Sequence, residues 1–191
     1  MNVRGGFGVF DEGVTKGLLR RSLLWHRGFD TPSLSRITFP ADQVISTVPS
    51  WSWMAYTGGI DYFELGFSGF EWENIGSPWS HRADNISLTE SRKANIALTA
   101  EAREYDPNAA VQGEGRLILD SPGGSEQPKT MCVVLGKQKG MMPLEDKIHY
   151  LLIVVPTTNH DRDGSKLYER VGAGYLPGKC IARGGSKVNI H

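Results

Sequence analysis

The side chains most capable of chemistry lie near the end of the chain, in the run from Tyr168 to Arg170. Side chains alternate between the two faces of a strand, so Tyr168 and Arg170 share one face and Glu169 takes the other. An inward-facing arginine needs an acidic partner, because an unpaired buried charge is very costly. Asp61 and Glu64 are candidate partners. We therefore expect Arg170 to form a buried or rim ion pair that closes the fold.

Two tryptophans form a second candidate contact surface. Trp51 and Trp53 are one residue apart, so in a strand both indoles face the same side. Such a pair can stack on a flat or sugar-like ligand, or it can anchor a core, since each indole buries roughly 150–250 Å². Both interpretations stay open. The candidate ligand or partner contacts are then Trp51, Trp53, Tyr56, Tyr168 and Arg170.

Groups for acid–base or metal chemistry are scattered. None of the 5 histidines stands at a metal-ligand spacing, and there is no Cys-x-x-Cys pair, so the sequence predicts no metal site. It also contains no phosphate-binding P-loop and no complete dinucleotide-binding glycine motif, so no cofactor is predicted. His149 adjoins an apolar strand, where a packed histidine is commoner than a general base. If the chain is an enzyme, the candidate catalytic residues are Asp61, His149 and Glu169.

The composition is that of an ordinary globular protein. The 191 residues suit one domain, 1–191, and hydrophobic residues make up 39% of them. Lys plus Arg and Asp plus Glu both number 21, so there is no net charge to attract nucleic acid or an anionic membrane. No apolar run approaches the roughly 20 residues of a membrane span, and no signal peptide is visible. We predict a cytoplasmic protein.

A helix is expected near the start of the chain, over residues 10–27. Phe10, Val14, Leu18 and Trp25 recur at spacings of four and seven, which marks one face of a helix. The stretch that follows, up to residue 49, reads as a turn-rich connection with one short strand near residues 36–39.

A hairpin is predicted over residues 51–65. An aromatic stretch from Trp51 to Tyr56 and a second from Ile60 to Phe63 flank Gly58-Gly59, and such glycines supply the positive φ angles of tight turns. The next segment mixes aromatics with glycine and charges too irregularly to assign. Its aromatic loops, around Phe67 to Trp79, are typical of segments that cover a core or contact a partner.

The second half of the chain alternates strand and turn. The predicted strands form a β-meander over about 95–191 and cover residues 95–104, 115–120, 130–135, 148–155, 166–172 and 186–190. The fourth is apolar at nearly every position, so we expect a central strand covered on both faces. With 23 glycines and 10 prolines, the chain favours a mainly β fold. We predict an antiparallel meander forming a sandwich or partial barrel, with the N-terminal helix packed on it.

Three segments resemble the C-terminal region of fungal heterokaryon-incompatibility (HET) domain proteins. The run from Gly17 to Arg27 is similar to that family's GLLWRR helix end, and Pro49 to Ala55 is similar to its PSWSWAS segment. The run from Tyr168 to Tyr175 resembles the closing strand written YERVGVG. The family's N-terminal module, which is credited with triggering cell death, has no counterpart in these residues. The resemblance therefore implies a recognition or regulatory part and transfers no catalytic residue.

Two hypotheses about function follow. The first is a noncatalytic recognition or regulatory module that contacts a protein partner or a small apolar molecule and exposes a broad apolar patch. The second is a small-molecule enzyme of fungal secondary metabolism, such as a cyclase, isomerase or dehydratase, which uses a pocket in the β scaffold. A cavity that joins Trp51, Trp53, Tyr168 and Arg170 to Asp61 or His149 would favour the enzyme.

Overall fold

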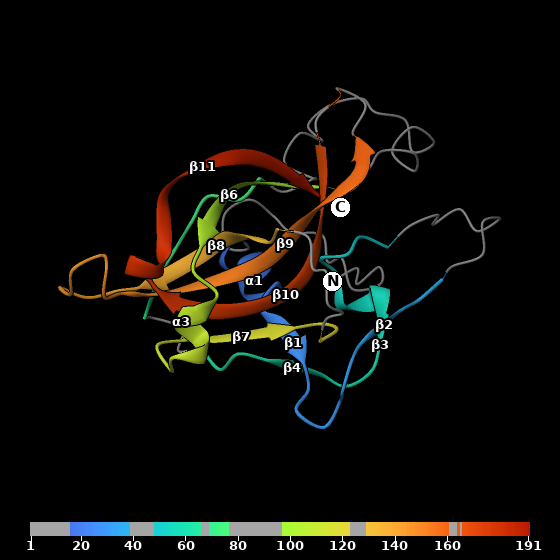
Figure 1. The fold of residues 1–191 in the computed structure, drawn as a ribbon, viewed down its shortest axis with the longest axis horizontal. Helices are drawn as coiled ribbons and strands as arrows, with labels where there is room; N and C mark the ends of the chain where they lie inside the picture. The colour runs from blue at the N-terminus through green and yellow to red at the C-terminus, as the bar shows by residue number, and fades with distance from the viewer. Residues whose placement is uncertain are drawn as a thin grey trace.

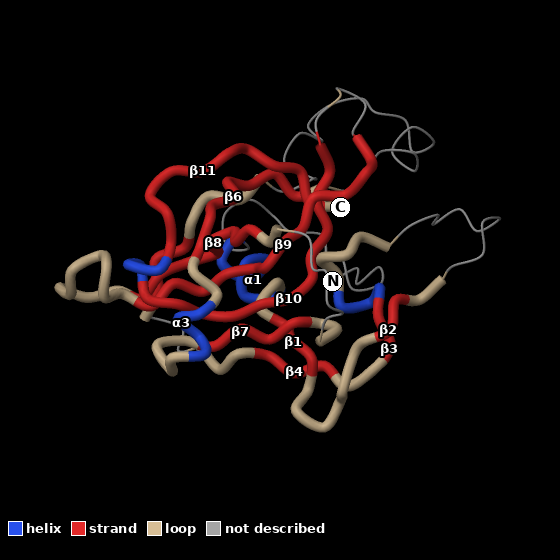
Figure 2. Tube along the Cα trace, viewed as in Figure 1, coloured by secondary structure: helices blue, strands red, loops and turns tan. Residues whose placement is uncertain are grey.

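The computed structural model is built mainly of β-strands, as Figure 1 and Figure 2 show, and this confirms the predicted fold class. It describes residues 16–38, 48–65, 69–76, 97–122, 129–160, 164 and 166–191. Seven strands of these residues form the main sheet: β5 (Phe70–Trp72), β6 (Leu98–Tyr105), β7 (Arg116–Leu119), β8 (Met131–Gln138), β9 (Ile148–His160), β10 (Lys166–Pro177) and β11 (Ile181–Ile190).

Five of these strands close into a barrel. The order is β11-β6-β8-β9-β10, and β10 pairs with β11 to complete the ring. The closing pair is parallel, with Tyr168 opposite Ile190, whereas the other pairs in the ring are antiparallel. The meander prediction holds for β8, β9 and β10, which follow one another as neighbours. The prediction of a sandwich or partial barrel thus resolves into a closed barrel, which leaves few unpaired strand edges.

Strand β7 leaves the meander and pairs with β10 beside the barrel. Two glycines of β10 allow this close approach. A Cβ at Gly172 would lie 2.6 Å from the carbonyl oxygen of Ile118, and one at Gly174 would meet the carbonyl oxygen of Arg116. Both glycines belong to the segment from Tyr168 to Tyr175. The glycines of that segment are therefore explained by the close packing of β7 on β10. A β-bulge between Arg170 and Gly172 interrupts the register with β9 just before this point.

The core has two clusters, one for each set of alternating side chains on β9. Leu152 and Val154 belong to the larger cluster, which draws on all five barrel strands. Leu151 and Ile153 belong to the smaller one. All four side chains are fully buried, so the prediction that residues 148–155 form a central strand covered on both faces is confirmed.

The predicted N-terminal helix is too long at its C-terminal end. Helix α1 (Lys16–Ser22) is followed by β1 (Trp25–Arg27), which pairs with β4 (Ile60–Tyr62). Residues 10–15 lie outside the described residues. The spacing of Trp25 wrongly predicted that the helix continues to residue 27. Leu23, Leu24 and Trp25 are all buried where the chain passes from α1 into β1, and they do not share one face of a helix. Helix α1 does pack on the larger core cluster, through Leu19 and Leu23.

The predicted hairpin over residues 51–65 is wrong. Residues Trp53–Ala55 form a short 3₁₀ helix, η1, whose first turn Ser52 caps by accepting a hydrogen bond from the Met54 backbone. The flanking strands do not pair with each other: β3 (Tyr56–Thr57) pairs with β2 (Ser35–Arg36), and β4 pairs with β1. The alternation of Trp51, Ser52 and Trp53 has the two-residue period of a strand, but Ser52 caps the 3₁₀ helix η1.

Two further elements complete the described chain. Helix α3 (Asn108–Val111) lies between β6 and β7, and the 3₁₀ helix η2 (Gly178–Cys180) joins β10 to β11. Within the described residues, no helix has the length and apolar character needed to cross a membrane.

Candidate functional site

The three family-like segments meet at one buried junction. Trp25, from the first segment, donates its indole N–H to the carbonyl oxygen of Trp51 in the second, at 2.9 Å. Arg170, from the third, donates from Nη2 to the carbonyl oxygen of Trp25 at 2.6 Å. Ser50 joins the second and third segments, because its hydroxyl oxygen accepts from the Arg170 backbone N–H at 2.9 Å. The same hydroxyl donates to the carbonyl oxygen of His191.

Arg170 is the centre of this junction. Its side chain is fully buried, and its Nη1 lies 2.5 Å from Oδ2 of Asp120. The guanidinium carbon lies 3.1 Å from the centre of the Trp25 ring, so the cation also packs against an aromatic face. The predicted buried ion pair is present, but the predicted partners Asp61 and Glu64 are wrong. Asp120 follows β7, and β7 reaches Arg170 only because it pairs with β10.

Burial and ion pairing shift the pKa values of Asp120 and Arg170 in opposite directions. Burial raises the pKa of Asp120, and the Arg170 guanidinium opposes that shift by favouring the carboxylate. Burial likewise lowers the pKa of Arg170, and Asp120 opposes that change. An arginine stays protonated in proteins, and its charge beside Oδ2 favours the carboxylate form of Asp120. Oδ1 of Asp120, however, is buried without a hydrogen-bond partner, and so is Nε of Arg170.

A cavity of about 260 Å³ lies beside the ion pair. The loop after β7 contributes Asp120, and the bulged part of β10 contributes Arg170 and Val171. Arg36 and Glu169 stand at its rim and pair at 3.1 Å, with side chains 39% and 41% exposed. The cavity thus holds two matched ion pairs, one buried and one at the rim, and apolar side chains line the space between them.

Tyr56 provides the phenol of this cavity. Burial, with the nearby Asp120 carboxylate, raises the pKa of Tyr56 to about 12. Its ring packs against Trp25, with 5.4 Å between the ring centres. At neutral pH the phenol therefore stays protonated, donates to the carbonyl oxygen of Arg170 at 3.5 Å and can accept a further hydrogen bond, but it does not act as a base.

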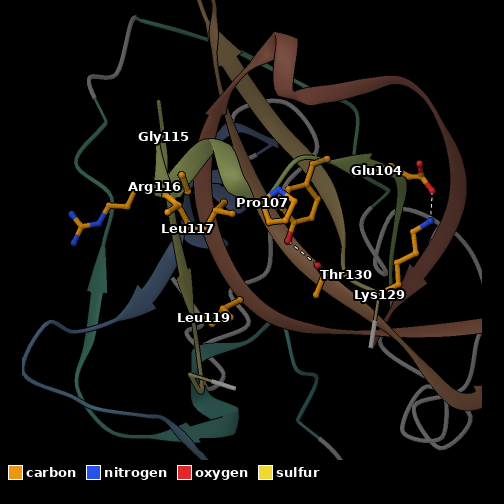
Figure 3. A pocket seen from close by; sticks show the side chains of 11 residues that line it. Glu104, Pro107, Gly115, Arg116, Leu117, Leu119, Lys129 and Thr130 are labelled. Atoms are coloured by element: carbon orange, nitrogen blue, oxygen red, sulfur yellow. Dashed lines mark hydrogen bonds and ion pairs between the residues drawn. The ribbon is translucent and has the colours of Figure 1, made fainter. Parts of the chain in front are cut away.

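A groove of about 700 Å³ adjoins the cavity, and Leu119 and Thr130 line both. Figure 3 shows this groove: Leu117 and Leu119 project from β7 on one side, and Thr130 lies across from them. The Thr130 hydroxyl shares a 2.8 Å hydrogen bond with the hydroxyl of Tyr105. Glu104 and Lys129 form an ion pair at the far side of the groove. The cavity and the groove are therefore neighbours along one face.

The structure brings two of the five predicted contact residues, Tyr56 and Arg170, to the cavity. Trp51 is buried in the larger core cluster, whereas Trp53 is 44% exposed, so the two indoles do not form one surface. Tyr168 packs half-buried against the same cluster, and its hydroxyl contacts the sulfur of Met131.

The three predicted catalytic candidates lie in different places. Glu169 lines the cavity, and Asp61 is exposed on β4. His149 is buried near η2, where burial lowers its pKa and its Nδ1 contacts the carbonyl oxygen of Lys147. It lines a separate pocket with Lys179 and Arg183. The three groups are thus not assembled into one acid–base site.

Asp120 is the residue that reasoning from the sequence missed. It is the last residue of a predicted strand, directly before Ser121-Pro122, and no functional or structural role was predicted for it. The sequence did contain a usable signal: an inward-facing Arg170 needs an acidic partner, and Asp120 directly follows the apolar run Leu117 to Leu119. The pairing of β7 with β10, which sequence does not reveal, was needed to connect them.

The predicted aromatic contact loops are only partly described. Phe67 and Trp79 lie outside the described residues. Phe70 and Trp72 belong to β5 and pack half-buried against the larger core cluster. Among the described residues, no group of three His, Cys, Asp or Glu side chains is placed to hold a metal ion.

The fold and the junction define a closed five-stranded β-barrel with a buried ion pair between Arg170, on barrel strand β10, and Asp120, which follows β7. A small cavity lies beside this pair. Comparison of the chain with protein-family models, with curated proteins and with solved structures found no match.

Proposed function

We propose that this chain is a noncatalytic recognition module that binds a small, uncharged, hydrogen-bond-donating group in the cavity beside Asp120 and Arg170. The observation that carries the proposal is the unpartnered Oδ1 of Asp120. A buried carboxylate oxygen without a donor is costly, and a ligand N–H or O–H that reaches it removes that cost.

An uncharged group suits the cavity because its charges are already balanced. Arg170 neutralises Asp120, and Arg36 neutralises Glu169. A ligand with a net charge would lose its hydration without gaining a new partner of opposite charge. An amide or a hydroxyl loses less and still supplies the missing donor.

Binding without catalysis is supported by the protonation states. The phenol of Tyr56, with its pKa raised to about 12, holds its proton at neutral pH. The Asp120 carboxylate is committed to Arg170 at 2.5 Å. General acid–base catalysis is most effective when the catalytic pKa lies near the working pH, and Tyr56 is far from it.

We further propose kinship with the C-terminal region of fungal HET proteins. The support is that the three similar segments, far apart in the chain, form one hydrogen-bonded junction through Trp25, Ser50 and Arg170. A motif that builds the interior of a fold can persist while its surface changes.

Titration with three compounds of three carbons each that differ in their polar group, followed by NMR chemical shifts, tests the proposed binding. Propionamide is expected to shift the signals of cavity residues saturably, whereas propionate and propylamine are not. Val155→Phe, which fills the cavity, is expected to abolish the effect, and Thr158→Phe on the exposed part of the same strand is the matched control. Equal shifts by all three compounds, or binding that persists in Val155→Phe, would refute the proposal. Chemical turnover of a bound amide would favour the small-molecule enzyme instead.

A further inference from the structure

The cavity and the groove together indicate the shape of the ligand. Resting on the function proposed above, we infer that the ligand is an elongated small molecule with an uncharged hydrogen-bond donor at one end and an apolar body. The donor occupies the cavity at Asp120, and the body lies in the groove lined by β7, α3, the end of β6 and the residues just before β8.

The two spaces are adjacent through shared walls. Leu119 and Thr130 line both the 260 Å³ cavity and the 700 Å³ groove. Leu119 is apolar, and the Thr130 hydroxyl is already engaged with Tyr105 at 2.8 Å. The part of the ligand that lies between the cavity and the groove therefore needs no polar group. Ligand pockets of about 300–1,000 Å³ typically hold molecules of drug-like size.

The groove is suited to a hydrocarbon body. Its walls include Leu117 and Leu119 from β7, Pro107 directly before α3, and Ala110 and Val111 of α3, of which Val111 is 87% exposed. Its charged side chains have partners of their own. Lys129 pairs with Glu104, and the guanidinium of Arg116 stacks on Phe29, 4.3 Å from the ring centre. Figure 3 shows Arg116 extending away from the other labelled side chains.

These surfaces predict how affinity depends on chain length. Each methylene transferred from water to an apolar wall contributes enough for about a fourfold gain in affinity. Chain extension therefore strengthens binding step by step, as long as the added carbons remain in the groove.

A series of straight-chain primary amides from propionamide to octanamide tests the inference by calorimetry or NMR titration. Binding is expected to tighten by about two- to fourfold per added methylene. Val111→Asp places a charge on the exposed groove wall and is expected to remove most of that gain, measured relative to propionamide in the same variant. Leu144→Asp, at the exposed tip of the β8–β9 turn, is the matched control and is expected to keep the gain.

The outcomes separate the two proposals. If no amide of any length binds, the proposed function itself fails. If propionamide binds and longer amides bind no tighter, the donor site stands and the elongated ligand is refuted. A full length-dependent gain in Val111→Asp would also refute it, because the apolar body would then lie outside the groove.

Discussion

The ion pair between Arg170 and Asp120 makes the strongest prediction about stability. Asp120→Asn leaves a fully buried guanidinium without a counter-charge, because the amide oxygen and the carbonyl oxygen and ring of Trp25 can contact it but carry no net negative charge. Removing one partner of a buried pair costs about 3–5 kcal/mol, because the other charge stays uncompensated. That loss is a large fraction of the roughly 5–15 kcal/mol of unfolding free energy of a typical domain.

The matched control is Glu169→Gln, which removes the carboxylate of the adjacent rim pair with Arg36. Both side chains of this pair are more than a third exposed, at 39% and 41%, so water already screens their attraction. Exposed ion pairs contribute about 0–1 kcal/mol to the free energy of unfolding. The two substitutions are chemically alike and lie beside the same cavity, so the difference between them isolates burial.

Urea denaturation measures that difference. With a slope of about 2 kcal/mol per molar urea, Asp120→Asn is expected to lower the unfolding midpoint by about 2 M and Glu169→Gln by less than about 0.5 M. Should Asp120→Asn fail to fold, the double variant Asp120→Leu with Arg170→Met removes both charges and is expected to fold, since apolar replacements of buried pairs are often neutral. Equal losses in the two single variants, or a double variant less stable than Asp120→Asn, would refute the reasoning.

Four further predictions follow from the same contacts. Ser50→Ala leaves the Arg170 backbone N–H without its acceptor and is expected to cost about 1–3 kcal/mol by urea denaturation, against less than about 0.5 kcal/mol for Ser35→Ala on the exposed strand β2. Because the pKa of Tyr56 is raised from 10.0 to about 12 in the fold, its contribution to stability is complete below about pH 10 and declines as the pH rises toward 12; unfolding free energies at rising pH should fall more steeply in the native protein than in Tyr56→Phe. Cys132 is buried with a pKa raised to about 12, whereas Cys180 is partly exposed, so mass spectrometry after brief alkylation should find Cys180 labelled first, and equal labelling of both thiols in the folded protein would contradict this. Leu151→Ala in the centre of β9 should cost about 2–5 kcal/mol in thermal or urea unfolding, while Met141→Ala at the fully exposed tip of the β8–β9 turn should be close to neutral.

The strands of the second half could be predicted because their signals are local. The continuous apolar run at Leu151 to Val155 requires cover on both faces, and the glycine- and proline-containing turns mark where strands end. The structure extends several of these strands. Strand β10, for example, continues from Gly172 to Pro177 in line with β9, where pairing with a long neighbour overrides the glycines that suggested an end.

The N-terminal elements could not be predicted in the same way. The spacing of Trp25 suggested a helix and that of Trp51 to Tyr56 suggested a strand, yet both segments are shaped by partners elsewhere. Trp25 lies in β1 because β4 pairs with it, and Trp53–Ala55 turns because Ser52 caps it. Short segments with a few apolar residues carry too little local preference to resist such contacts.

The sequence by itself determined that this protein is mainly β, that its apolar strand at residues 148–155 is central, and that Arg170, if it faced inward, would require an acidic partner. These results rest on periodicity and on the cost of an unpaired buried charge, which act wherever the residue lies. Only the tertiary structure decided that the acid is Asp120 and that Trp25, Ser50 and Arg170 meet at one junction. The physical reason is that β7 and β10 lie about 50 residues apart in the chain and become neighbours only through sheet pairing, which depends on the whole barrel and not on any local pattern.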